Sequence, residues 1–167
     1  MYKADCVISS RGKEGNIFTM ELKLETPLKK FQRREYYRLE CAIEASVTMI
    51  NEDELEHFNK TGKLPEELEM PEEKGVIIDI SGGGMKFVGC GFKTGDRVYI
   101  EFDYMLGAAK QSLKVTAQII DSVHPHDRKD IFHNRASFIN IKNDDREALI
   151  RFIFEEERKR MQLERRM

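Results

Sequence analysis

Strict alternation of apolar and polar residues over positions 16–25 is the first regular pattern in the chain. One face of this segment carries Phe18, Met20, Leu22 and Leu24. The pattern predicts a half-buried β-strand, with Tyr2–Ser9 as a looser partner strand and Arg11–Gly15 as the turn between them. Because an isolated hairpin is marginal in water, we expect it to pack on the rest of the chain or to be the last part of a larger amino-terminal domain.

A longer alternation runs from Tyr37 to Met49, and it places Tyr37 and Leu39 on the core side of a predicted strand. Further strand-like segments follow at even spacing, separated by polar or glycine-rich connections. They are Val76–Ile80, Met85–Val88, Arg97–Tyr104, Leu113–Ser122 and Arg135–Ile141. Short strands in this arrangement favour a closed or nearly closed antiparallel barrel.

A single helix is predicted at the end of the chain, over 143–167. Asp144 and Glu147 have the spacing of a capping box. Its apolar positions are Leu149, Phe152 and Ile153. From Glu155 onward the segment is almost wholly charged, so we expect the first half to dock on the barrel and the second half to lie in water.

An acidic segment, 51–75, interrupts the predicted strands, with ELEHF and EELEM as possible helical turns. It carries a net charge of −6, which leaves +4 for the rest of a chain whose total is −2. We interpret it as a solvated loop. The surroundings of Lys29–Arg38 are therefore more basic than the total suggests, which favours an anionic partner.

Cysteine usage and hydropathy exclude several classes of protein. Cys6, Cys41 and Cys90 are odd in number and widely spaced, so neither a disulfide framework nor a zinc site is indicated, and a reducing cytoplasm fits best. The sequence has no signal peptide and no apolar run near ~18 residues, so we expect no membrane insertion. It also lacks a nucleophile beside a base or a plausible carboxylate pair, so we expect no enzyme.

Three arginines lie just before the long predicted strand or at its start: Arg33, Arg34 and Arg38. In an extended strand Arg34 and Arg38 would share a face, and their guanidinium groups could converge. Paired guanidinium groups can hold phosphate oxygens bidentately and stack on a flat base, a combination that suits a phosphorylated purine. Arg33, in the linker, could add a third and movable contact. The alternative is an edge strand that carries charge to prevent aggregation.

The segment VIIDISGGGMKF contains a second candidate site. Asp79 and Ser81 share a face, the Asp79 carboxylate suits the N1–H and amino group of guanine, and the following glycines permit positive φ or close approach of a ligand. The same residues could instead form a tight turn in which Asp79 and Ser81 bond their own backbone.

A cluster of His124, His126, Asp127, Asp130 and His133 could in principle bind a metal. A His-Pro-His loop lacks the fixed geometry of a metal site, so we interpret it as a polar loop.

Together, Arg33-Arg34-Glu-Tyr-Tyr-Arg38 and Asp79-Ile-Ser81-Gly-Gly-Gly84 resemble the RxxxR and D/N-x-S-x-x-G signature of the PilZ domain family. Order and strand context also match, and the preceding hairpin resembles the YcgR-like (flagellar brake type) arrangement with a truncated amino-terminal domain. The resemblance implies a mainly β fold, a six-stranded antiparallel barrel with a C-terminal α-helix, preceded by a β-hairpin. The expected organisation is a hairpin remnant over 1–27 and a PilZ domain over 28–167.

The resemblance further implies binding of cyclic di-GMP as a ligand rather than a cofactor. Arg34 and Arg38 would hold phosphate and guanine, Asp79 and Ser81 would read guanine edges, and Gly84 would keep the floor of the site open. Arg33 is associated in the family with an intercalated ligand dimer.

The expected function is that of a cytoplasmic cyclic di-GMP receptor. Binding would change the conformation of the linker and regulate motility, exopolysaccharide synthesis or adhesion through a protein effector, such as a flagellar motor or synthase component. The alternatives are a small barrel that binds single-stranded nucleic acid through Tyr36 and Tyr37, and a ligand-independent adaptor. A buried Tyr37 would count against nucleic acid.

Overall fold

The computed structural model describes residues 1–32, 34–125 and 131–166, which form two compact units, Met1–Glu35 and Tyr36–Met167. The first unit contains only short strands: β1 (Tyr2–Lys3), β2 (Cys6–Glu14), β3 (Ile17–Leu24) and β4 (Lys29–Lys30). Strand β2 pairs with β3 in an antiparallel hairpin, and β1 pairs with β4. The boundary between the units falls inside the predicted arginine motif.

The predicted turn of the hairpin is misplaced. The strands continue to Glu14 and resume at Ile17, so the turn is Gly15–Asn16, with Gly15 at φ 59°. This left-handed conformation suits a two-residue hairpin turn. The alternation over 16–25 is confirmed as a strand. Its apolar face is not covered by the described residues of its own unit, since Phe18 is 79% exposed.

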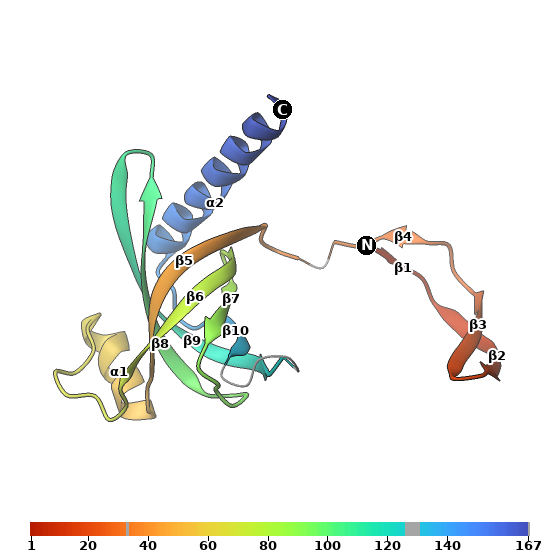
Figure 1. Ribbon diagram of the computed structural model, residues 1–167, viewed down its shortest axis with the longest axis horizontal. Coiled ribbons are helices and arrows are strands. Elements are labelled where there is room, and N and C mark those ends of the chain that lie inside the picture. The colour runs from red at the N-terminus through yellow and green to blue at the C-terminus, as the bar shows by residue number, and fades with distance from the viewer. Residues whose placement is uncertain (33, 126–130, 167) are drawn as a thin grey trace. The chain divides into compact units, whose positions relative to one another are not determined.

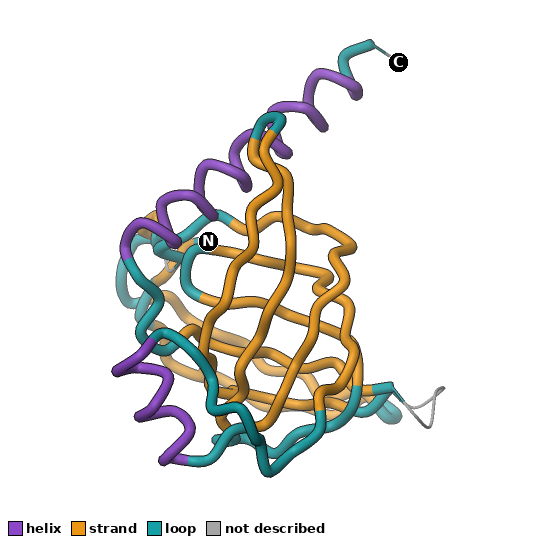
Figure 2. The backbone as a smooth tube through the Cα atoms, turned by 90° about the vertical axis from the view of Figure 1, so that its left-hand side faces the viewer, coloured by secondary structure: helices purple, strands orange, loops and turns teal. Residues whose placement is uncertain are grey.

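The second unit is a closed antiparallel barrel with the strand order β10-β7-β6-β5-β8-β9. Its strands are labelled in Figure 1, and Figure 2 shows them wrapped around one interior. Its strands are β5 (Arg38–Met49), β6 (Glu72–Ser81), β7 (Gly84–Gly89), β8 (Arg97–Leu106), β9 (Ala109–Val123) and β10 (Phe132–Phe138). Every strand predicted for the barrel is present. The interior is filled by inward-facing apolar side chains, among them Leu39, Val47, Ile77, Ile80, Phe87, Ile100 and Leu113.

Helix α2 (Asn143–Glu164) packs on β5, β6 and β8 through its first half. Leu149, Phe152 and Ile153 are buried as predicted, and the second half extends past the barrel (Figures 1 and 2). The predicted capping box is wrong, because Lys142 is the N-cap residue and no side chain caps the helix.

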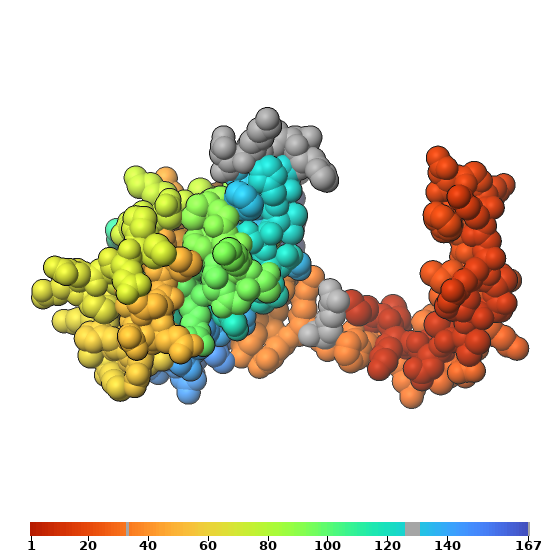
Figure 3. Space-filling view, turned by 90° about the horizontal axis from the view of Figure 1, so that it is seen from below, coloured from red at the N-terminus to blue at the C-terminus, as the bar shows by residue number. Residues whose placement is uncertain are grey.

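The segment 51–75 is largely exposed, as interpreted, and ELEHF is helical, but the segment is not a loop throughout. The segment contains helix α1 (Glu52–Thr61), capped by a reciprocal pair of hydrogen bonds between Asn51 and Glu54. Phe58 packs edge-on against Tyr99 of β8, and the segment adjoins the barrel in the space-filling view (yellow in Figure 3). EELEM is not helical, and β6 begins at Glu72.

Candidate functional site

Arg38 of the first signature stretch and Asp79 and Ser81 of the second, about forty residues apart in the sequence, lie on the adjacent strands β5 and β6. In the antiparallel register of β5 and β6, Arg38 is opposite Ser81, and Glu40 is opposite Asp79. The Arg38 Nη1 lies 3.9 Å from the Asp79 Oδ2, and the Arg38 side chain is 49% exposed. A loose, solvent-screened ion pair contributes at most ~1 kcal/mol, so Arg38 can exchange this partner for a ligand phosphate at little cost.

Small residues form a row across three strands beside Arg38. Ser81 of β6 is opposite Gly84 of β7, and Gly84 is opposite Ser137 of β10. A Cβ on Gly84 would overlap the carbonyl oxygen of Ala136, so glycine is required here by close packing of backbone. Gly84 does not have a positive φ, so close approach of backbone, and not a left-handed conformation, is the property of glycine used at this position.

The hydroxyl of Ser81 serves the turn between β6 and β7. Its Oγ donates to the Gly84 carbonyl oxygen at 3.0 Å and accepts from the Gly83 N–H at 3.4 Å. Ser81 is also buried. The turn interpretation therefore holds for Ser81, while the Asp79 carboxylate stays on the outer face with its side chain 25% exposed.

A second row, which carries charge, runs parallel to the small residues. It crosses β5, β6, β7, β10 and β9 through Glu40, Asp79, Lys86, Arg135 and Asp121, each opposite the next in register. Arg135 forms an ion pair with Asp121. The barrel surface beside the small row therefore offers both carboxylate acceptors and cationic donors.

Tyr36 joins the start of the barrel unit to helix α2. Its hydroxyl accepts a 3.0 Å hydrogen bond from Arg146 Nη1, whose guanidinium lies 5.7 Å from the ring centroid. Its ring lies over the β6–β7 turn, where a Cβ on Gly82 would be 2.6 Å from the ring. The Arg146 Nε is buried without a hydrogen-bond partner within the described residues.

Tyr37 does not point into the core, contrary to the prediction. It is 50% exposed and stacks on Phe154 of α2 at a centroid distance of 6.2 Å. A hydrogen bond to Glu157 raises the Tyr37 pKa above its ordinary value. Strand β5 begins only at Arg38, so the alternation on which the orientation of Tyr37 was based starts one residue later.

The two remaining arginines of the motif are not placed in the strand. Arg34 belongs to the Met1–Glu35 unit, where it is exposed, and its carbonyl oxygen accepts from the Gln32 side-chain amide at 3.1 Å. Contrary to the prediction, Arg34 and Arg38 do not share a strand face, because β5 begins at Arg38. Arg33 lies outside the described residues.

The thiol of Cys41 reports on the electrostatics near Asp79. Desolvation, followed by the negative charge of Asp79, raises the Cys41 pKa to about 11. Its Sγ lies 3.6 Å from the Ile77 carbonyl oxygen. Cys41 is therefore a partly buried thiol that is protonated, and hence a poor nucleophile, at neutral pH.

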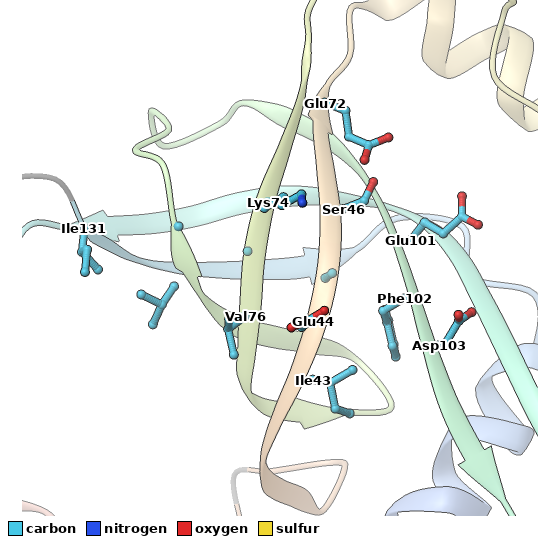
Figure 4. A pocket seen from close by; sticks show the side chains of 14 residues that line it. Ile43, Glu44, Ser46, Glu72, Lys74, Val76, Glu101, Phe102, Asp103 and Ile131 are labelled. Carbon is cyan, nitrogen blue, oxygen red and sulfur yellow. The ribbon is translucent and has the colours of Figure 1, made fainter.

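A separate hollow of about 710 Å³ lies on the barrel between β5, β6 and β8 (Figure 4). Its labelled carboxylates include Glu44, Glu72, Glu101 and Asp103, and Lys74 is the one cation among its described lining residues. This lining disfavours a phosphate ligand. The signature residues are not part of it.

Within the described ranges, no group of three or more metal-ligating side chains is present, and no helix is long and apolar enough to cross a membrane. His126, Asp127 and Asp130 of the predicted polar loop lie outside those ranges. His124 contacts Phe132 edge-on at 4.9 Å, and the polar-loop interpretation stays a prediction.

Several residues near the site were missed from the sequence. Lys86 follows Gly84 by two positions, so strand alternation could have placed it on the same face. Ser137 and Arg146 carry no such signal, because only the barrel closure and the docking of α2 bring them to the motif.

Comparison with known proteins supports this architecture. The profile of the PilZ domain matches residues 32–155. The chain is similar to the inhibitor of motility MotI/DgrA from Bacillus subtilis, with 18% identity and a TM-score of 0.67 over 99% of this chain and 69% of that one. A comparison with curated proteins gives no match.

Two structures from Escherichia coli are also similar. YcgR in complex with c-di-GMP has 18% identity and a TM-score of 0.57, over 94% of this chain and 60% of that one. The PilZ domain of YcgR with c-di-GMP has 18% identity and a TM-score of 0.54, over 81% of this chain and 100% of that one. At this identity the likeness establishes the fold. Since the profile also covers most of the sequence, the chain belongs to the PilZ domain family.

Proposed function

We propose that this protein is a receptor for cyclic di-GMP, which binds on the outer surface of β5, β6 and β7. The observation that carries the proposal is the register that sets Arg38 opposite Ser81 and within 3.9 Å of Asp79. A guanidinium for phosphate and a carboxylate for the guanine edge are thus available on one surface. The Escherichia coli YcgR structures, which share this fold, contain c-di-GMP.

Each side chain has a defined role in this proposal. Arg38 exchanges its weak ion pair with Asp79 for a ligand phosphate, which a guanidinium can hold with two parallel hydrogen bonds. Asp79 accepts from guanine N1–H and the exocyclic amine. Ser81 and Gly84 act mainly through shape, since the Ser81 hydroxyl is bonded within the turn and Gly84 permits close strand packing.

Binding would order the linker between the two units. The unit boundary, after Glu35, lies between Arg34 and Arg38. A ligand held by both arginines would therefore tie the Met1–Glu35 unit to the barrel, an order–disorder switch driven by new arginine–phosphate pairs. Arg33 would add a further contact and bring a second nucleotide.

The output of the switch is a protein effector. We infer a cytoplasmic, non-catalytic role in motility, exopolysaccharide synthesis or adhesion, with a flagellar motor or synthase component as the partner. The similar fold of an inhibitor of motility favours the first of these. The division into a hairpin remnant, 1–27, and a PilZ domain, 28–167, is part of the same proposal.

Single-stranded nucleic acid is a weaker candidate ligand. The exposure of Tyr37 removes one objection to it, but this ring already stacks on Phe154. Glu40 and Asp79 lie beside Arg38 and limit the basic patch to a short stretch, which suits a small dinucleotide better than the long backbone of a nucleic acid. A nucleic-acid ligand would show a steep loss of affinity with salt.

Isothermal titration of cyclic di-GMP tests the proposal, with the wild type, Arg38→Ala and Arg34→Ala as the proteins. Charge-assisted hydrogen bonds contribute ~1.5–3 kcal/mol each, so either substitution is expected to weaken binding at least ~tenfold. Arg158→Ala is the matched control, because Arg158 is an exposed arginine on α2. Linear GMP and single-stranded oligonucleotides serve as ligand controls.

The titration has clear outcomes. Binding by the wild type and by Arg158→Ala, with loss in Arg38→Ala, supports the receptor. The molar ratio measures whether one or two nucleotides bind. No heat of binding with the wild type would refute the proposal. Tighter binding of oligonucleotides than of cyclic di-GMP would favour a single-stranded nucleic acid as the ligand instead.

A further inference from the structure

The position of Lys86 on the barrel suggests a role in base recognition. It lies on β7, opposite Asp79 of β6 and opposite Arg135 of β10. Side chains that face each other directly across antiparallel strands have Cβ atoms ~4.5–5.5 Å apart and point to the same face. Lys86 therefore extends from the surface beside the carboxylate that is proposed to read guanine.

The charges of its neighbours are already paired, while the charge of Lys86 is not. Asp79 lies near Arg38, on the side away from Lys86, and Arg135 is paired with Asp121. Within the described part of the chain, the side-chain ammonium group of Lys86 forms no ion pair or hydrogen bond. A hollow of about 340 Å³ adjoins it, lined by Val123, His133 and Arg135 among others. The Lys86 side chain is therefore not enclosed on the side of β9 and β10, so its ammonium group can change rotamer.

We propose that Lys86 donates a hydrogen bond to guanine O6 while Asp79 accepts from N1–H and the exocyclic amine. The inference rests on the proposed function and assigns the base specificity of that site. The Watson–Crick edge of guanine presents one acceptor, O6, directly beside its two donors. A cation and a carboxylate at adjacent register positions present the complementary order of charge.

Adenine reverses that order and is rejected by the same pair. Its amino group would face the Lys86 ammonium, and its N1 lone pair would face the Asp79 carboxylate. The first contact sets a donor against a donor, and the second sets an acceptor against an acceptor. Both leave desolvated polar groups without a hydrogen bond, and such unpaired groups give a binding site its largest discrimination between ligands. A lysine that only attracts phosphate would not distinguish the two bases, since both cyclic dinucleotides carry the same phosphates.

The experiment compares cyclic di-GMP and cyclic di-AMP by isothermal titration with the wild type, Lys86→Met and Lys74→Met. Lys74 is the matched control: it is exposed and lies on β6, in the acidic hollow of Figure 4. Thermal unfolding checks that each variant folds. Lys86→Arg, which keeps the charge and its donors, tests rescue.

Lys86→Met is expected to weaken cyclic di-GMP binding about tenfold, the loss of one charge-assisted hydrogen bond. The same substitution should leave cyclic di-AMP binding unchanged or improve it. The dissociation constant for cyclic di-AMP divided by that for cyclic di-GMP should therefore be smaller in Lys86→Met than in the wild type. Lys74→Met should alter neither, and Lys86→Arg should restore most of the affinity.

Two results would overturn the inference while the proposed function stands: unchanged cyclic di-GMP binding by Lys86→Met, or a loss with no narrowing of the ratio. Failure of the wild type to bind cyclic di-GMP would instead remove the proposed function, and the assignment of Lys86 with it.

Discussion

Replacing Gly84 with alanine tests whether close packing of β7 on β10 positions the site. The added Cβ would overlap the carbonyl oxygen of Ala136, at well under 3.0 Å, and would lie 3.1 Å from the Ser137 Cα. Both are backbone atoms of the paired strand, so no side-chain rotation relieves the overlap. Strands β7 and β10 must separate locally, at the row of small residues.

The magnitude follows from the atoms that are displaced. Overpacking costs ~1–3 kcal/mol, with the upper part of the range expected where backbone must move. Alanine also lowers the conformational entropy of the unfolded chain, which stabilises the folded state by ~0.4–1 kcal/mol. The net loss of about 2 kcal/mol corresponds to a fall in Tm of roughly 4–8 °C.

Gly83→Ala is the matched control, one residue away in the same turn. Its Cβ would lie 3.1 Å from the Tyr36 ring, a side chain that can shift by a few tenths of an ångström. We expect a change in Tm within ~2 °C for this variant. Thermal unfolding followed by circular dichroism measures both.

Equal Tm values for Gly84→Ala and the wild type would refute the reasoning. They would mean that the barrel accommodates this Cβ without cost, so packing of β7 on β10 would not require glycine at position 84. In the same samples, Gly84→Ala should weaken cyclic di-GMP binding. The displaced backbone would move the carbonyl oxygen of residue 84, which accepts the 3.0 Å hydrogen bond from Ser81 Oγ in the wild type.

Three further predictions concern other parts of the barrel unit. Glu54→Ala removes a buried carboxylate that accepts from the backbone N–H groups of Asn51 and Glu69. It should lower the free energy of unfolding, measured with denaturant, by ~1–3 kcal/mol. An unchanged unfolding midpoint would contradict the role of Glu54 as a buried cap. Because its pKa is raised to about 11, Cys41 should resist alkylation at pH 8 and react faster as the pH rises toward that value; mass spectrometry that finds rapid modification at pH 8 would be inconsistent with burial. Arg146→Met removes the hydrogen bond to Tyr36 and should increase hydrogen exchange at the start of β5, and unaltered exchange would mean that α2 does not hold this segment.

The sequence by itself determined the strand pattern of the barrel and the content of its signature. Alternation placed β5 to β10, because one buried face imposes a period of two on any half-buried strand. The apolar positions Leu149, Phe152 and Ile153 identified the docked half of α2 for the same reason at helical spacing. Arg38 and Asp79 were found because their chemistry is local to short motifs that border regular strands.

Only the tertiary structure decided which of these residues meet. Alternation holds within a strand and carries no information beyond its end, so it failed for Arg34 and Tyr37, which precede the first residue of β5. The buried Glu54 carboxylate accepts a hydrogen bond from the N–H of Glu69, which is distant in the sequence, and the neighbours of Lys86 depend on the register of β7 with two other strands. Pairing between strands is a long-range property, fixed when the barrel closes around its core, and no short segment of the sequence records it.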